Sequence, residues 1–136
     1  MMRTETKGRA RALQLLYAAE TQGRTVHQMV PGLSKITGPE PTVLDFAEHL
    51  AGGVMSDRVA LDQLIQAAAD NWRIERLAVI DRNILRLAAH EMKTESAPPI
   101  VAIDEALWLA HRFGTRDSPG FINGVLDRIA RGLGRL

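Results

Sequence analysis

Hydrophobic residues recur along most of the chain at the spacing of α-helices, and no stretch alternates apolar and polar positions as a half-buried strand would. The most apolar stretch runs from Leu77 to Glu95, within the longer segment Trp72–Glu95. Its apolar positions are Leu77, Ile80, Ile84, Leu85, Leu87, Ala88, Ala89 and Met92. A helix that is apolar over so much of its surface is predicted to be central to the fold, with other helices packed around it.

The polar positions of this central helix form a second pattern. Arg82, Arg86, His90 and Lys93 follow one another at intervals of three or four residues, so they are expected to form one basic row. Glu91 instead falls on the apolar face, where an unpaired carboxylate would cost several kcal/mol. A structural ion pair or a helix-end contact is the favoured interpretation of Glu91, and a functional role is the alternative.

Six further segments show helical or turn patterns, and the predicted fold class is therefore all-α, with about seven helices in a single domain. The segments are 7–22, a short turn at 25–30, 42–51, 57–70, 100–113 and a last helix from residue 118. The prolines and glycines between residues 31 and 41 predict a loop. Thr42 and Asp45 have the form of a capping box, and Gly52 is expected to end that helix. Ser118 before Pro119 predicts an N-cap.

Composition excludes several classes of protein. The 136 residues are 46% hydrophobic and 24% charged, which is typical of a soluble globular domain. There are no cysteines, so neither disulfides nor thiolate chemistry is expected. No apolar run is long enough to span a membrane, and the N-terminus lacks the apolar stretch of a secretory signal. A cytoplasmic location without membrane contact is the expectation.

Charge is distributed unevenly along the chain, although the net charge is only +1. Basic residues dominate positions 1–39, acidic residues dominate 40–71, and 72–136 is mixed with a basic excess. Such blocks favour a polarised surface that attracts phosphates on one side. The alternative is that the two blocks face each other or are solvated separately.

No arrangement typical of catalysis or metal binding is present. The four histidines lack metal-site spacing, and no second histidine follows His90-Glu91 at the position that an H-E-x-x-H site needs. Asp104 and Glu105 are adjacent on a helix and diverge by about 100°, a poor acid–base pair. The sequence therefore predicts a protein that is not an enzyme and that uses neither a metal nor a cofactor.

The basic start of the chain is the stronger signal. Arg3, Lys7, Arg9 and Arg11 begin an otherwise regular helix, where positive charge opposes the helix dipole. Contact with nucleic-acid phosphates would explain them, and a solvated end that aids solubility is the alternative. Phe121 follows the turn at residues 115–120, where it could stack on an unpaired base or equally anchor the core.

Three segments, in order, resemble the NusB family of bacterial transcription antitermination factors. The first is Arg9-x-Arg-Ala-x-x-x-Leu-Tyr17-x-x-Glu20, and the second extends from Trp72 to Glu91. The third begins at Pro99 and continues through Phe113-Gly-x-x-Asp-Ser-x-x-Phe-Ile-Asn-Gly-Val-Leu-Asp127. The resemblance covers nearly the whole chain and implies an all-helical fold of two packed three-helix subdomains, at about 1–71 and 72–136.

The resemblance also implies a function and partners. NusB proteins bind the boxA element of nascent RNA, usually as a heterodimer with NusE, the small-subunit ribosomal protein. The complex joins other Nus factors on RNA polymerase and suppresses premature termination, notably in ribosomal RNA operons, without catalysis. Some members self-associate, so a homodimer is possible and the oligomeric state is left open.

Site residues follow from matching the motifs. Arg9 and Arg11 match the basic RNA-binding start, which is often denser in the family, and Arg3 and Lys7 of the same basic segment are expected to bind RNA with them. Asp117, Ser118 and Phe121 correspond to a turn and helix start that borders the RNA. The expected NusE-facing residues are Tyr17, Glu20, Arg76 and Asp81. The sparse basic start predicts modest RNA affinity for the chain alone, with NusE strengthening the binding.

Two competing interpretations belong to other functional classes. A NusB-like domain also forms the N-terminal part of a ribosomal RNA cytosine methyltransferase, which needs a large α/β domain that this sequence does not contain. The other is a helical adaptor that binds NusE or another protein without contacting RNA. Salt-dependent RNA binding separates the adaptor from the antitermination factor.

Overall fold

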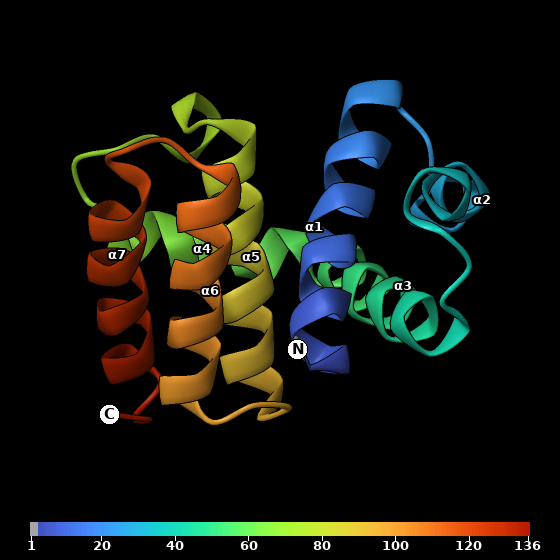
Figure 1. Ribbon diagram of the computed structural model, residues 1–136. Coiled ribbons are helices and arrows are strands. Elements are labelled where there is room, and N and C mark those ends of the chain that lie inside the picture. The colour runs from blue at the N-terminus through green and yellow to red at the C-terminus, as the bar shows by residue number, and fades with distance from the viewer. Residues whose placement is uncertain (1–2) are drawn as a thin grey trace. The chain divides into compact units, whose positions relative to one another are not determined.

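The computed structural model describes residues 3–136 and shows an all-helical chain, with no strand in that range. Seven α-helices and one short 3-10 helix follow one another (Figure 1). Their bounds are α1 Thr4–Gln22, α2 Val26–Thr37, α3 Pro41–Ser56, α4 Arg58–Ala68, η1 Ile74–Arg76, α5 Val79–Thr94, α6 Pro99–Phe113 and α7 Ser118–Gly132. The predicted all-α class is confirmed.

The chain forms two compact units, one ending at Ser56 and the other beginning at Asp57. The N-terminal unit holds α1, α2 and α3, and the C-terminal unit holds the remaining helices. The division therefore falls earlier than the boundary expected near residue 71. The reason is that α4 packs on α5 and α7, which makes it part of the C-terminal unit.

In the N-terminal unit, α1 packs along α3, and α2 contacts both of them. Leu13 and Leu16, on successive turns of α1, are almost completely buried. Val54 of α3 has no exposed surface. Gly8 allows the two long helices to approach each other, because a side chain there would enter the space of the Phe46 ring. The absence of a side chain at Gly8 thus lets α1 pack closely on α3.

Replacing Gly8 with alanine is expected to lower the free energy of unfolding by about 1–3 kcal/mol, since the added Cβ collides with Phe46. The helix propensity of alanine recovers only about 1 kcal/mol of that loss. Gly52→Ala in α3 is the matched control, because nothing lies within 4 Å of its added Cβ. Urea unfolding should show Gly52→Ala unchanged or more stable than wild type; equal destabilisation by both would contradict this account.

Two helices extend beyond their predicted limits. Residues 31–37 were expected to be loop, yet α2 continues through Pro31 to Thr37. A capping box between Thr25 and Gln28 stabilises the start of this helix, and Pro31, in its middle, removes one backbone hydrogen bond. Likewise α3 starts at Pro41 rather than after a Thr42 cap, and it continues through Gly52 to Ser56.

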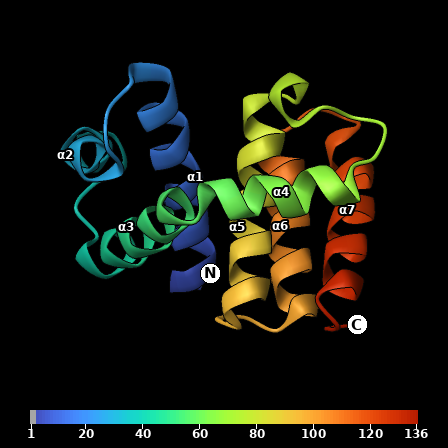
Figure 2. The ribbon, with the colours of Figure 1, turned by 180° about the vertical axis from the view of Figure 1, so that it is seen from behind.

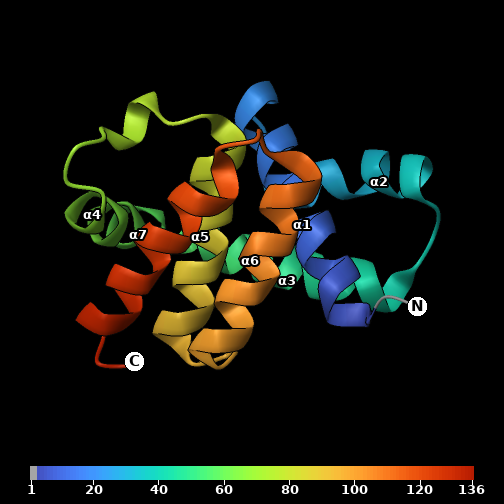
Figure 3. The ribbon, with the colours of Figure 1, turned by 60° about the vertical axis from the view of Figure 1, so that its left-hand side comes forward.

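In the C-terminal unit, α5, α6 and α7 lie side by side and α4 crosses them (Figures 2 and 3). Helix α5 contacts α4, α6 and α7, and Ile84, Leu85 and Ala89 on it are completely buried. The predicted central role of this helix therefore holds within its unit. It begins at Val79, later than the pattern indicated, because η1 and an extended residue at Ala78 come first. Glu91 is buried, at 3% exposure.

The basic row of α5 packs against α4 through ion pairs. Arg86 donates from Nε to Asp62 Oδ1 (2.7 Å) and from Nη2 to Asp62 Oδ2 (2.9 Å), a bidentate pair. Lys93 Nζ lies 2.9 and 2.8 Å from the two oxygens of Asp57. Part of the acidic block at 40–71 thus pairs with basic residues of the segment 72–136, an arrangement that neither interpretation of the charge pattern included.

The pKa of His90 predicts a pH dependence of the stability of this unit. Burial lowers the pKa of His90 from its ordinary value of 6.5, although the nearby carboxylates of Asp57 and Glu91 act in the opposite direction and Lys93 acts in the same one. The unfolded chain then binds more protons than the folded chain below about pH 6.5, so stability falls as the pH drops through that range.

His90→Gln is therefore expected to lose less stability between pH 7.5 and 5.5 than wild type, because glutamine does not titrate. Urea unfolding of both proteins at the two pH values measures the loss of unfolding free energy in each. The contribution of the carboxylates is common to both proteins and cancels in the comparison. A wild-type loss equal to that of the variant would show that His90 does not contribute to the pH dependence.

Candidate nucleic-acid interface

Two connecting segments meet at one end of the C-terminal unit. The segment between α4 and α5 and the turn between α6 and α7 lie at the same end of the helices (Figure 1). They enclose a pocket of about 250 Å³. Its walls are Trp72, Arg76, Leu77, Ala78, Asp81, Thr115, Asp117, Ser118 and Phe121.

The turn before α7 is held by its own side chains. The Thr115 backbone N–H donates to Ser118 Oγ at 2.9 Å, and Ser118 is 1% exposed. A side chain at Gly114 would meet Ser118 at 2.6 Å from the added Cβ to Oγ, so only glycine fits there. Ser118 was expected to be the N-cap of α7, but that position belongs to Asp117. The Ser118 hydroxyl instead closes the turn, which leaves the Asp117 side chain exposed beside the pocket.

Phe121 and Trp72 form an aromatic pair at the pocket wall. Their ring centroids are 5.8 Å apart and the planes are inclined by 74°, an edge-to-face contact. Trp72 is nevertheless 59% exposed, and Phe121 is half-buried. An aromatic ring that is anchored by a neighbour yet open to solvent is suited to stacking on an unpaired base.

Residues predicted for two different roles line this single pocket. Arg76 and Asp81, expected to face NusE, stand beside Asp117, Ser118 and Phe121, expected to face RNA. The pocket therefore offers a guanidinium, two carboxylates and aromatic surface within one small volume. Such a mixture can contact phosphate, base edges and base faces together.

The basic residues at the start of the chain differ in exposure. Arg3 is exposed, Lys7 Nζ lies 3.1 Å from Glu40 Oε2, and Arg11 Nη1 donates to Gln14 Oε1 at 3.0 Å. Lys7 and Arg11 are both half-buried and stand one helical turn apart on α1. These three residues are the cations of this helix start that solvent reaches.

Arg9 is placed differently from its neighbours. It is only 7% exposed, and its guanidinium carbon lies 5.9 Å from the centroid of the Phe46 ring. This cation–π contact joins α1 to α3 within the N-terminal unit. Arg9 was expected to be a phosphate ligand; the structure shows that it packs on Phe46, and its contact with RNA stays a prediction.

The other predicted partner-facing residues belong to the N-terminal unit. Tyr17 and Glu20 lie on the last turns of α1, and both are exposed, Tyr17 by 46%. A large aromatic side chain that is half-exposed on a helix is typical of a protein-binding position.

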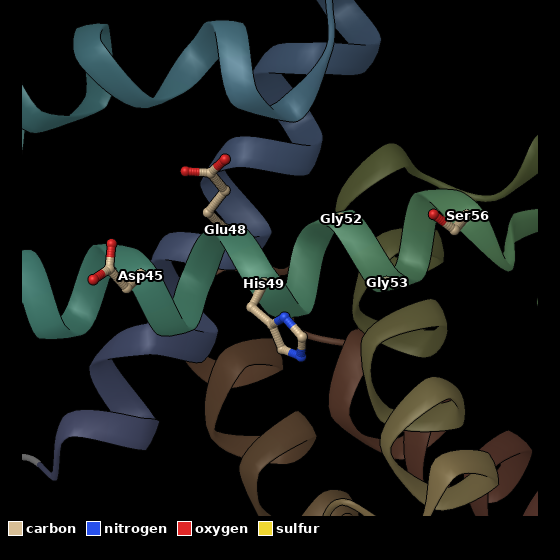
Figure 4. A pocket seen from close by; sticks show the side chains of 6 residues that line it. All are labelled: Asp45, Glu48, His49, Gly52, Gly53 and Ser56. Atoms are coloured by element: carbon tan, nitrogen blue, oxygen red, sulfur yellow. The ribbon is translucent and has the colours of Figure 1, made fainter.

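A larger hollow lies over α3 but lacks the features of a site. Its volume is about 530 Å³, and all its lining residues belong to this one helix. Figure 4 shows Glu48 and His49 pointing to different sides of α3, and Glu48 Oε2 is already 2.6 Å from His27 Nδ1. Gly52 and Gly53 leave space in the hollow but provide no side chain that could bind a ligand.

Sequence reasoning gave no site role to Trp72 or Thr115, although both line the pocket. Trp72 was only one of six aromatic residues, and nothing in its spacing points to Phe121 far along the chain. One signal was available. Trp72 falls between two predicted helices, outside any apolar stripe, where a large aromatic side chain has no helix face to cover.

Other kinds of site receive no support within residues 3–136. No group of three or more histidine, aspartate or glutamate side chains there could hold a metal ion. In the same range, no helix is both long enough and apolar enough to cross a membrane.

Comparisons with known proteins agree over almost the whole chain. The model of the NusB family matches residues 6–131. The transcription antitermination protein NusB of Sorangium cellulosum is 43% identical over 136 residues, covering 99% of this chain and 97% of that protein. The protein of the same name from Myxococcus xanthus is 39% identical, covering 94% and 95%.

Solved structures show the same fold. A crystal form of T. maritima NusB has a TM-score of 0.83 and 32% identity, covering 96% of this chain and 93% of that one. A crystal structure of the antitermination factors NusB and NusE in complex with dsRNA has a TM-score of 0.86 and covers 97% and 99%. Its identity of 22% makes this second likeness one of fold.

Proposed function

We propose, from the premise that this chain belongs to the NusB family of transcription antitermination proteins, that it binds the boxA element of nascent RNA as a heterodimer with NusE. The complex joins other Nus factors on RNA polymerase in the cytoplasm and supports transcription of ribosomal RNA, with no catalytic step. The observation that carries the RNA-binding role is the pocket in which an open aromatic pair adjoins Arg76 and Asp117.

The exposed cations of α1 supply the sequence-independent part of binding. Arg3, Lys7 and Arg11 contact phosphates, while Arg9 holds the helix start against Phe46. Lys7 exchanges its partner Glu40 for phosphate, so its contribution is smaller than that of a fully exposed lysine. Three such contacts are few, which agrees with modest affinity for the chain alone.

The turn and start of α7 supply the base-reading part. Phe121 stacks on an unpaired base, and Ser118 keeps the turn in shape from its buried position. The exposed carboxylate of Asp117 repels phosphate, so it accepts hydrogen bonds from base amino groups instead.

Three exposed residues and the half-buried Asp81 are assigned to the protein partner. Tyr17 and Glu20 contact NusE from α1, and Arg76 and Asp81 contact it from the rim of the pocket. Because Arg76 and Asp81 also border the base-reading residues, NusE and RNA are bound cooperatively. NusE then strengthens RNA binding by ordering a shared site.

Titration of labelled boxA RNA is expected to give weak binding by the chain alone and about five- to 150-fold tighter binding with NusE. A scrambled RNA of equal length should gain much less. Equal affinity with and without NusE would contradict the cooperative part of the proposal. Capture of NusE without any salt-dependent RNA binding would instead support the adaptor class.

A further inference from the structure

A second hollow of the C-terminal unit lies next to the pocket and shares part of its wall. Trp72 and Phe121 line both spaces, and the second one has a volume of about 320 Å³. Its other walls come from residues 69–71, just after α4, and from α7, including Arg128. Apart from Trp72 and Phe121, the two spaces share no lining residue.

We propose that this second hollow binds the neighbouring unpaired nucleotide of the same RNA strand, with its base on Trp72 and its phosphate at Arg128. The inference rests on the proposed RNA-binding function and extends it by a separate nucleotide subsite. Continuity carries the assignment, because the aromatic wall is common to both spaces and a strand leaving the first meets the second at once.

The geometry of the aromatic pair fits two splayed bases rather than one. The Trp72 and Phe121 planes are inclined by 74°, so one flat base cannot lie against both rings. Trp72 keeps 59% of its surface exposed despite its contact with Phe121. Each ring therefore has its own surface for a base, and the two bases are turned relative to each other, as in single-strand recognition.

Arg128 is held in a position from which it can contact a phosphate. Its Nη1 donates to the backbone oxygen of Ala68 at 3.1 Å, which fixes the guanidinium at the wall of the hollow. A guanidinium has five N–H donors, so further donors are available to a ligand, and the residue is exposed. A charge held in place in this way loses little side-chain entropy on binding.

The remaining polar walls suit a base edge. Asn71 offers both an amide donor and an acceptor, and the carboxylate of Asp70 accepts hydrogen bonds only. Asp70 repels phosphate, which places the phosphate on the Arg128 side of the hollow and favours a base that presents an amino group toward Asp70.

The test compares a boxA RNA with versions that carry one additional unpaired nucleotide at the 5′ or the 3′ end, titrated in the presence of NusE. Wild type should bind one of the extended RNAs about fivefold more tightly or better, as expected for one added stacked base. Arg128→Gln should lose this gain yet keep wild-type affinity for the unextended RNA. For the extended RNA, the slope of log affinity against log salt should also fall by about 0.7.

Arg131→Gln is the matched control. Arg131 lies on the same helix, is exposed and pairs with Asp127 at 3.0 Å, but it does not line the hollow. This variant should retain the full gain. The stacking contact is measured separately, with 2-aminopurine as the added nucleotide. Wild type should quench the fluorescence of 2-aminopurine, and Trp72→Leu should quench it much less.

Each failure has a distinct meaning. The subsite is overturned if neither extension strengthens wild-type binding, or if Arg128→Gln keeps the gain. It is also overturned if Arg128→Gln weakens binding of the unextended RNA or of NusE while remaining folded by circular dichroism. If wild type with NusE binds no boxA RNA at all, the proposed function itself fails, and the subsite fails with it.

Discussion

Asp62→Ala is expected to lower the free energy of unfolding by about 3 kcal/mol, the largest stability effect of the ion pairs between α4 and α5. The Arg86 side chain is only 8% exposed, and both its Nε and its Nη2 donate to Asp62. Removing the carboxylate takes both of these charge-assisted hydrogen bonds from a buried guanidinium, which also donates to Asn83 Oδ1 at 3.0 Å. Urea unfolding of the two proteins gives the difference.

Two comparisons make this prediction specific. Lys93→Gln breaks a pair whose side chains are 37% and 27% exposed, and it should cost about 1 kcal/mol or less. The double variant Asp62→Leu with Arg86→Met removes both charges of the buried pair, so it should be more stable than Asp62→Ala. Equal losses from Asp62→Ala and Lys93→Gln would mean that burial does not set the strength of these pairs.

Phe121→Leu is expected to weaken boxA binding about five- to 150-fold, because one base loses its aromatic platform while the apolar bulk at the pocket is kept. The effect should be nearly independent of salt, since no charge is removed. The RNA titration at several salt concentrations therefore separates this variant from losses at Arg3, Lys7 or Arg11, which change the slope.

Phe113→Leu is the control for Phe121→Leu. Phe113 ends α6, lies about 6.0 Å from the guanidinium carbon of Arg112 and does not line the pocket. Its replacement should leave RNA affinity unchanged. Comparable losses from the two variants would assign the effect to general packing of the helices rather than to a stacked base.

Helix patterns predicted the fold well where a helix has one strongly apolar face. The last three helices begin within a few residues of their predicted starts, and α5 and α6 also end near their predicted limits, because their apolar spacing and their flanking prolines and glycines agree. The pattern misplaced the ends of α2 and α3, since Pro31 and Gly52 are tolerated inside helices that packing and capping stabilise. Local propensity is a weaker force than tertiary contact at such positions.

The unit boundary was misplaced for a different reason. Asp57 is the N-cap residue of α4 and Asp62 lies within this helix, and the partners of both residues lie on α5, later in the chain. The expected boundary near residue 71 came from the family resemblance, which implies two three-helix subdomains. The packing of α4 on α5 and α7, which includes the pairing of Arg86 with Asp62, shows that α4 belongs with the C-terminal unit.

The candidate site was predicted in part, through motifs rather than through spacing. Family motifs indicated Asp117, Ser118 and Phe121, and the structure gathers all three at one pocket. They gave no partner for Phe121, because the Trp72 contact joins residues far apart in sequence. The motifs also did not show that Arg9 packs on Phe46, because that contact joins two helices and cannot be seen in the spacing along one of them.

The exposure of Trp72 has a spectroscopic consequence. The chain contains two tryptophans, and the other, Trp108, is half-buried on α6. An indole in water emits at longer wavelength than one surrounded by apolar side chains, so the red edge of the emission comes mainly from Trp72. Intrinsic fluorescence therefore reports on occupation of the aromatic wall without a dye, and Trp108→Phe leaves that signal from a single residue.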